Sequence, residues 1–282
     1  MADFTERLFL PGGLLLEASV KRFRLHHLSP WQDHPAETLS PEGDAASTRQ
    51  LMSGALYAGL SVATMVRPSS AGRDVLLRYI HGLASAWRTT GATPGAMRRA
   101  AQRLEDRGQV ALADYCRHVA EEETGHDILA WRDIEALDLP AEAFVEQCQP
   151  AAAMALAGRQ QALAESDEPV AVLGYAYALE RTSLNVTAEV VAEVEGALPA
   201  GVNATRCLRV HSAVGTDIHH VAESLEFIAT LPACDRAIIA REAFNTGRII
   251  GGMDDYPGNG AMHALLSSLG WRHLEPAAAA CA

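Results

Sequence analysis

Apolar residues recur every three to four positions along most of this chain, between about residues 46 and 252. That period places them on one face of an α-helix, whereas the alternation typical of a half-buried β-strand is largely absent. Proline and glycine residues interrupt the pattern, because proline cannot continue a helix and glycine weakens one. The pattern predicts an all-α fold with helices over residues 46–66, 72–89, 95–106, 109–137, 141–165, 169–196, 204–231 and 234–252.

The two ends of the chain lack this pattern. Residues 1–45 contain Pro11-Gly12-Gly13 and further prolines, so we expect an irregular N-terminal segment there. Residues 46–255 are expected to form one helical domain, because no linker rich in proline, glycine or serine divides them. Residues 256–282 are expected to be a C-terminal tail, with a loop over 251–260 that closes the last helix and an Ala-rich end that frays.

Acidic residues outnumber basic ones, with 35 Asp and Glu against 23 Lys and Arg and a formal net charge of -12. Binding along nucleic-acid phosphates needs a basic surface, so we expect no nucleic-acid partner. The five cysteines form no CxxC pair and predict no disulfide framework, which fits a reducing cytoplasm. The N-terminus lacks the basic region of a secretory signal, and the apolar run 51–66 is too short to span a bilayer, so we expect a cytoplasmic protein without a membrane segment.

The predicted helix over 109–137 carries ionisable residues on its apolar face. At about 100° per residue, His126 shares the face of Val119 and Leu129, and Glu122 and Glu123 lie there too. Burying such groups without partners would cost several kcal/mol. The spacing Glu123-x-x-His126 offers two ligands to one cation, although an ordinary salt-bridged surface also explains such a run.

Two further predicted helices add groups of the same kind. Glu180 follows a stretch without charge and lies on an apolar face, where either a metal ion or a core ion pair with Arg159 or Arg181 would compensate it. The helix over 204–231 concentrates imidazoles and a carboxylate in ten positions, which indicates either metal ligands or a partly exposed polar face. These residues are His211, Asp217, His219 and His220. Together the three helices hold the ligand inventory of a dinuclear carboxylate site.

The same three helices resemble a known family. The segments 121–137 (EEETGHDILAWRDIEAL), 173–180 (LGYAYALE), 209–211 (RVH) and 217–223 (DIHHVAE) resemble the metal-binding helices of the haem-oxygenase-like diiron oxidases and oxygenases. The resemblance spans about residues 50–255 and implies a haem-oxygenase-like bundle of about seven core helices that binds two irons rather than haem. The metal ligands that it implies are Glu123, His126, Glu180, His211, Asp217 and His220, with Glu122 and His219 as alternates.

The spacing on the third helix departs from the family pattern. The family has three residues between its first His and its Asp, whereas five separate His211 from Asp217. On an unbroken α-helix Asp217 would lie about 120°, and His220 about 180°, away from His211, so the three could not converge. We therefore expect a distorted segment between Val214 and Asp217, centred on Gly215, since glycine is the weakest helix former there. A regular helix would instead pair His211 with His219 or leave one metal site incomplete.

The resemblance implies a non-haem diiron enzyme that uses two iron ions (Fe2+/Fe3+), with O2 as co-substrate, to oxidise a small amino-acid-like or fatty-acid-like molecule. N-oxygenation, desaturation or oxidative carbon-carbon cleavage within a biosynthetic pathway are the reactions it suggests. Tyr115 and Tyr177 are candidates for lining the cavity, with a plain core role as the alternative for each. Arg159, Arg181 or Arg206 could hold a substrate carboxylate through a bidentate contact.

Other functions remain open at this point. A metal-independent relative of thiaminase-like type would need a nucleophilic cysteine, for which Cys116 and Cys207 lie on relevant helices; a quinone-cofactor-oxidase-like relative is a further alternative. A non-catalytic helical binding protein is a third. A ferritin-like bundle matches poorly, because it needs an extra glutamate on the helix before its first Glu-x-x-His, and the earlier helices offer Asp74 on one and Glu105 and Asp106 at the end of another. The partners expected are a small-molecule substrate and an external electron donor, and a homodimer is left open.

Overall fold

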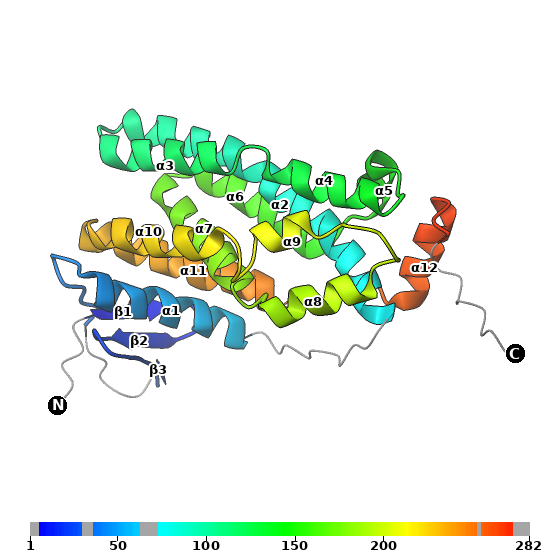
Figure 1. Cartoon of the computed structure of the whole chain (residues 1–282). Coiled ribbons are helices and arrows are strands. Elements are labelled where there is room, and N and C mark those ends of the chain that lie inside the picture. Colours follow the sequence, from blue (N-terminus) through cyan, green and yellow to red (C-terminus); the bar gives the residue numbers. More distant parts are fainter. Residues whose placement is uncertain (1–5, 30–35, 63–72, 253–254, 273–282) are drawn as a thin grey trace, which may run out of the picture.

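The computed structural model describes residues 6–29, 36–62, 73–252 and 255–272, and within them the fold is a helical bundle with one small sheet (Figure 1). The predicted all-α class is therefore confirmed. The helices are α1 (Ala45–Val62), α2 (Arg73–Glu105), α3 (Val110–Glu122), α4 (His126–Ala136), α5 (Ala141–Gln147), α6 (Ala151–Ala164), α7 (Val172–Ser183), α8 (Ala188–Ala197), α9 (Arg206–Val210), α10 (Asp217–Ala229), α11 (Ala233–Gly252) and α12 (Asn259–Ser268), with a 3₁₀ turn η1 (Pro169–Ala171) before α7.

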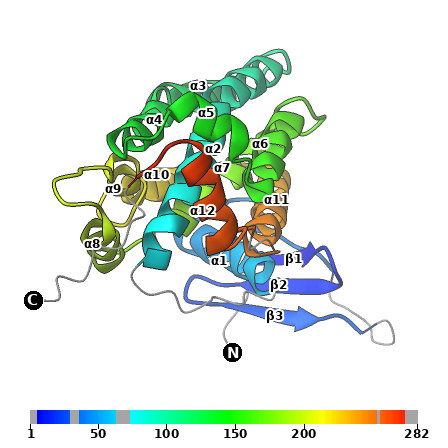
Figure 2. The same ribbon diagram turned by 90° about the vertical axis from the view of Figure 1, so that its right-hand side faces the viewer.

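Helix α7 lies at the centre of the bundle, where it contacts α2, α6, α10 and α11. The long helix α2 packs against α3, α4 and α6, and α1 packs against α11. Both views place α3 and α4 on one side of the molecule and α1 with the sheet on the other (Figures 1 and 2). Helix α7 is therefore surrounded by four other helices.

The N-terminal segment is not irregular between residues 6 and 27. It forms an antiparallel sheet of β1 (Glu6–Leu10), β2 (Leu14–Ala18) and β3 (Phe23–His27), which packs beside α1 (Figure 2). Strand β1 pairs with β2 in the register Leu10↔Leu14, so the three residues 11–13 form a hairpin loop in which Gly12 and Gly13 have φ of 85° and 72°. The prediction was wrong because the Pro-Gly-Gly run ends one short strand and begins the next rather than excluding strands.

Helix α2 runs through Pro94, where the sequence predicts a break. Proline has no N–H, so the helix loses the backbone hydrogen bond that residue 94 would donate to Thr90. The packing of α2 against three other helices outweighs the local cost of the proline.

Four of the predicted helices are divided by turns. The helix expected over 109–137 becomes α3 and α4, that over 141–165 becomes α5 and α6, that over 169–196 becomes η1, α7 and α8, and that over 204–231 becomes α9 and α10. The apolar periodicity continues across each turn, so it does not indicate where one helix ends and the next begins.

The expected C-terminal tail contains helix α12, so the loop predicted over 251–260 ends at its first residues. Residues 63–66 and 72 of the predicted helices and the Ala-rich end at 277–282 lie outside the described residues. Among the described helices, none combines the length and apolar character needed to cross a bilayer.

Candidate metal centre

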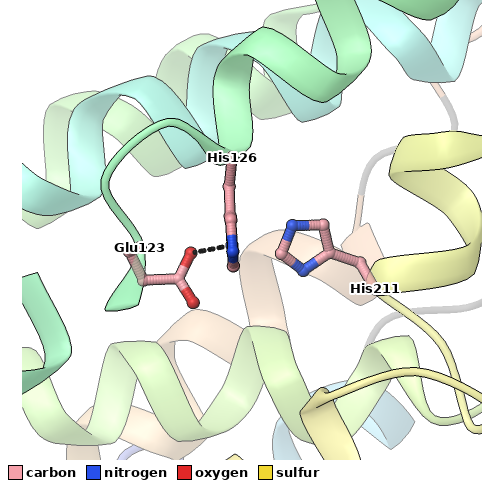
Figure 3. A group of neighbouring side chains, drawn as sticks. All are labelled: Glu123, His126 and His211. Atoms are coloured by element: carbon pink, nitrogen blue, oxygen red, sulfur yellow. Dashed lines mark hydrogen bonds and ion pairs between the residues drawn. The ribbon is translucent and has the colours of Figure 1, made fainter. Parts of the chain in front are cut away.

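Glu123 and His126 flank the turn between α3 and α4. Glu123 is the residue directly after α3, His126 is the first residue of α4, and Gly125 between them has a φ of 92°. This left-handed conformation suits glycine and interrupts the helical path between α3 and α4, which follow one another along α2 (Figure 1). The turn brings Glu123 Oε2 to 3.0 Å from His126 Nδ1 (Figure 3), so the pair is held by a turn rather than by one continuous helix.

The helix predicted over 204–231 is interrupted from His211 to Thr216, which confirms the expected distortion and shows that it is longer than expected. The Thr216 N–H donates to Val210 O at 3.2 Å, so the chain folds back on the end of α9. A Cβ on residue 215 would lie 2.0 Å from that same oxygen, so only glycine fits there. The interruption turns His211 toward the other candidate ligands.

Five of the six predicted ligands form two groups that share Glu123. The first group is Glu123, His126 and His211, and the second is Glu123, Glu180 and His220; within each group one possible ligand atom per residue lies within 4.8 Å of the others. Figure 3 shows the first group, in which the imidazoles of His126 and His211 approach each other with ring centroids 4.9 Å apart. In the second group His220 Nδ1 lies 3.9 Å from Glu123 Oε1. The groups come from α3, α4, α7, α10 and the segment after α9.

Asp217, the sixth predicted ligand, belongs to neither of these groups. It is 1% exposed, and both of its oxygens have partners: Oδ1 lies 3.3 Å from His211 Nδ1, and the Ser183 hydroxyl donates to Oδ2. The carboxylate therefore lies behind His211. This arrangement is typical of a residue that orients a metal-binding histidine rather than of a ligand.

Two buried atoms in the groups have no hydrogen-bond partner within the described part of the chain: Glu180 Oε2 and His211 Nε2. Leaving such atoms unpaired costs about 1–3 kcal/mol each, more for a charged group. A cation at each group would bind both atoms, and carboxylate oxygen with imidazole nitrogen is a donor set that suits iron or manganese. The residues present therefore fit a pair of metal ions.

The pKa shifts of the site residues also favour a bound cation. Burial raises the pKa of Glu180 well above its ordinary value, and the neighbouring carboxylates of Glu123 and Asp217 raise it further. The pKa of His126 is raised, chiefly by its hydrogen bond to Glu123. Without a cation the site thus holds protons where the same groups in water would have released them, because negative charge accumulates there.

The two alternates lie outside the inner groups. His219 is exposed on α10. Glu122 has 34% of its side chain exposed and contacts His118 at 3.4 Å; with His118 and Glu223 it forms a separate group nearer the surface. The distance of 4.0 Å between Glu122 Oε1 and His220 Nε2 makes it a neighbour of the inner groups rather than a member.

A cavity of about 470 Å³ adjoins the centre and is lined by Glu123, Glu180, His211 and Asp217 together with residues of α2, α6, α7 and α11. Tyr115 and Tyr177 do not line it, contrary to expectation. Tyr115 stacks on Phe227 at 3.9 Å between ring centroids, and Tyr177 is fully buried with its hydroxyl 3.4 Å from that of Ser53. Helices α3 and α7 are buried on more than one side, so sharing a face with a ligand did not decide which neighbour each tyrosine meets.

The tyrosines that do line the cavity are Tyr79 and Tyr175. No signal in the sequence distinguished them, because Tyr79 lies on the predicted helix over 72–89, which carries no candidate ligand.

The arginines expected as substrate anchors have other partners. Arg159 donates to Glu242 at 2.9 Å, and Arg206 to Asp133 at 3.0 Å. Neither they nor Arg181 line the cavity. The core ion pair considered for Glu180 is also not formed with Arg159, because Arg159 binds Glu242 instead.

The cysteines on the relevant helices are buried thiols. Burial raises the pKa of Cys116 and of Cys207 to about 12, so neither is ionised near neutral pH. A nucleophilic cysteine needs a lowered pKa. Neither thiol therefore has the lowered pKa that is typical of an activated cysteine nucleophile.

Comparisons with protein-family models, with curated proteins and with solved structures found no match. The fold and the site define an α-helical protein with an internal cluster of carboxylates and imidazoles beside a cavity.

Proposed function

We propose that this protein is a non-haem diiron enzyme, an oxidase or oxygenase that uses O2 to oxidise a small molecule. The observation that carries the proposal is the pair of buried, unpartnered atoms, Glu180 Oε2 and His211 Nε2, in two ligand groups that share Glu123. The resemblance of these helices to the haem-oxygenase-like diiron family supports the same function and suggests iron as the metal.

In this proposal one iron is held by Glu123, His126 and His211, and the other by Glu123, Glu180 and His220. Two ferrous ions held by these residues would supply the electrons for the reduction of O2, and an external electron donor would be needed to restore them. Asp217 accepts the Nδ1–H of His211, which leaves Nε2 without a proton and free to bind metal. Ser183 donates to Asp217 and so holds that carboxylate in place.

The cavity has a separate role. It brings a substrate to the face of the site formed by Glu180 and His211. The oxidation then takes place beside ligands that the fold has already positioned.

Iron binding and O2 uptake test the proposal. We expect metal-free protein titrated with Fe(II) under anaerobic conditions to bind two ions per chain, and to consume O2 once air is admitted. His220→Ala should bind one ion and lose most O2 uptake. His219→Ala removes the neighbouring, exposed imidazole of the same helix and should behave as the parent protein does.

Three results would count against the proposal. They are a parent protein that binds no Fe(II), one that binds it without consuming O2, and equal loss in both histidine variants. The first would favour a metal-independent enzyme or a non-catalytic binding protein, and the second a metal-binding protein that does not activate O2.

A further inference from the structure

The lining of the cavity indicates the chemistry of its ligand. Away from the carboxylate and imidazole end, the walls are mainly apolar, with Leu83, Leu156, Leu179 and Ile250 from four different helices. A volume of about 470 Å³ lies in the range of cavities that enclose small organic ligands, about 300–1,000 Å³. The cavity therefore fits an apolar molecule of moderate size.

None of the described residues that line the cavity is a lysine or an arginine. Carboxylates of substrates are usually held by such cations. Here the ionisable lining residues are Glu123, Glu180, Asp217, His211, Tyr79, Tyr175 and Cys207. In the metal-free protein a carboxylate inside this cavity would lie beside Glu123 and Asp217 with no basic side chain in the described lining to pair with it, so the structure does not favour an amino acid or a fatty acid.

Two hydrogen-bond donors in the lining have no partner within the described residues: Gln160 Nε2 and the Tyr175 hydroxyl. Both side chains are fully buried. Gln160 Oε1 lies 3.4 Å from the Thr93 hydroxyl oxygen, and the amide nitrogen on the other side of the group has no partner among the described residues. Burial raises the pKa of Tyr175, so its hydroxyl keeps its proton and remains a donor.

We propose that the cavity binds an uncharged, largely apolar molecule whose carbonyl-type oxygen accepts hydrogen bonds from Gln160 and Tyr175. That this molecule is a substrate rests on the proposed function; that it binds does not, because both donors are outside the metal groups. The acceptor satisfies two buried donors that otherwise remain unpaired, and the apolar remainder fills the space between the helices.

Binding of eight-carbon probes to the metal-free protein, followed by isothermal titration calorimetry, tests this inference. We expect octanamide to bind, and octanoate, which has the same length and a negative charge, to bind at least tenfold more weakly. Gln160→Leu and Tyr175→Phe should each weaken octanamide about three- to tenfold, the effect of one net hydrogen bond. The circular dichroism spectrum and the unfolding midpoint establish that each variant is folded.

A matched pair of glycine variants tests whether the probe occupies this cavity. Gly82 lines the cavity on α2, and Gly158 is exposed on α6 away from it; a Cβ on either would meet no atom within 4 Å. Gly82→Leu places a side chain in the cavity and should abolish octanamide binding, whereas Gly158→Leu should leave it unchanged.

The inference is overturned if octanoate or L-leucine binds more tightly than octanamide, if Gly82→Leu binds octanamide as the parent does, or if both donor variants keep full affinity. Its failure is distinguishable from failure of the proposed function. A protein that binds two irons and consumes O2 but not octanamide refutes only the ligand class, and one that binds octanamide but no iron refutes only the enzyme.

Discussion

Glu180 is the residue on which protonation and metal binding compete most directly. Its pKa is raised from an ordinary value of 4.5, first by burial and then by the charges of Glu123 and Asp217. The folded, metal-free protein therefore keeps a proton on Glu180 at pH values where the unfolded chain has released it. By linkage, this contribution to stability is fully present below pH 4.5 and is lost as the pH rises toward the folded-state pKa.

The first prediction follows for Glu180→Gln, which replaces the carboxyl group by a neutral group of the same shape. The variant should be more stable than the parent at neutral pH without metal, and the difference should disappear near pH 4. Urea unfolding of both proteins across this pH range measures it. Glu193→Gln, at an exposed position of α8, should show no such gain. A parent protein that is as stable as Glu180→Gln at pH 7 would mean that the carboxyl group is not desolvated.

The second prediction separates a metal ligand from a residue that orients one. Asp217→Asn should keep both ions but bind them about 10- to 100-fold more weakly, because the amide holds His211 less well than the carboxylate does. Competition with a chelator measures the affinity, and Asp114→Asn on the exposed face of α3 is the control. Loss of one ion outright would show that Asp217 binds metal itself, as the family resemblance implies.

At the scale of elements, the site depends on interruptions between helices more than on the helices themselves. Glu123 and His126 meet across the turn between α3 and α4, and His211 is the first residue of the six-residue interruption before α10. The distortion near Gly215 was predictable because a continuous helix cannot bring His211 and His220 together. The turn at Gly125 was not predicted, because a Glu-x-x-His pair is equally compatible with one helical turn.

The third prediction concerns that interruption. In Gly215→Ala the new Cβ would lie 2.0 Å from Val210 O and 2.3 Å from Arg209 O, so the segment between α9 and α10 must move. We expect the variant to lose about 1–3 kcal/mol of stability and at least tenfold in metal affinity. Gly196→Ala in α8, where a Cβ meets nothing within 4 Å, should gain about 0.5–1 kcal/mol and bind metal normally. A stable Gly215→Ala protein with normal metal binding would contradict the role given to the interruption.

At the scale of the whole molecule, a buried ion pair joins the N-terminal sheet to the bundle. Arg236 on α11 and Glu6 on β1 are both fully buried, with Nη1 3.2 Å from Oε1. Removing one partner of such a pair leaves the other charge buried and unpaired. The sheet is therefore an integral part of the fold, although the sequence predicts an irregular segment there.

The fourth prediction uses this pair. Arg236→Met should lower the free energy of unfolding by about 3–5 kcal/mol. Replacing both partners, in Glu6→Leu with Arg236→Met, should restore a substantial part of that loss. Arg117→Met, which breaks an exposed pair with Asp114, should change stability by about 1 kcal/mol or less. If Arg236→Met costs no more than Arg117→Met, the buried pair does not hold the sheet to the bundle.

The sequence was sufficient for the helical class and for most of the residues that meet in the interior. Helical periodicity locates apolar faces, and Glu123, His126 and Glu180 stand out because charged groups on such faces need compensation. The sequence was insufficient for side-chain contacts that depend on which helices pack together. Tyr115 and Tyr177 share faces with ligands but pack on α10 and α1. Arg159 donates to Glu242 on α11, which is far from it in the sequence. Such pairings follow from the arrangement of helices, which periodicity does not encode.

We propose that two metal ions lie between the carboxylates and imidazoles of the two groups. Anomalous diffraction at the iron absorption edge, from crystals grown or soaked with Fe(II) without oxygen, locates such ions. We expect two peaks per chain, one beside Glu123, His126 and His211 and one beside Glu123, Glu180 and His220. Absence of both peaks, or iron found only at the outer group of His118, Glu122 and Glu223, would contradict it.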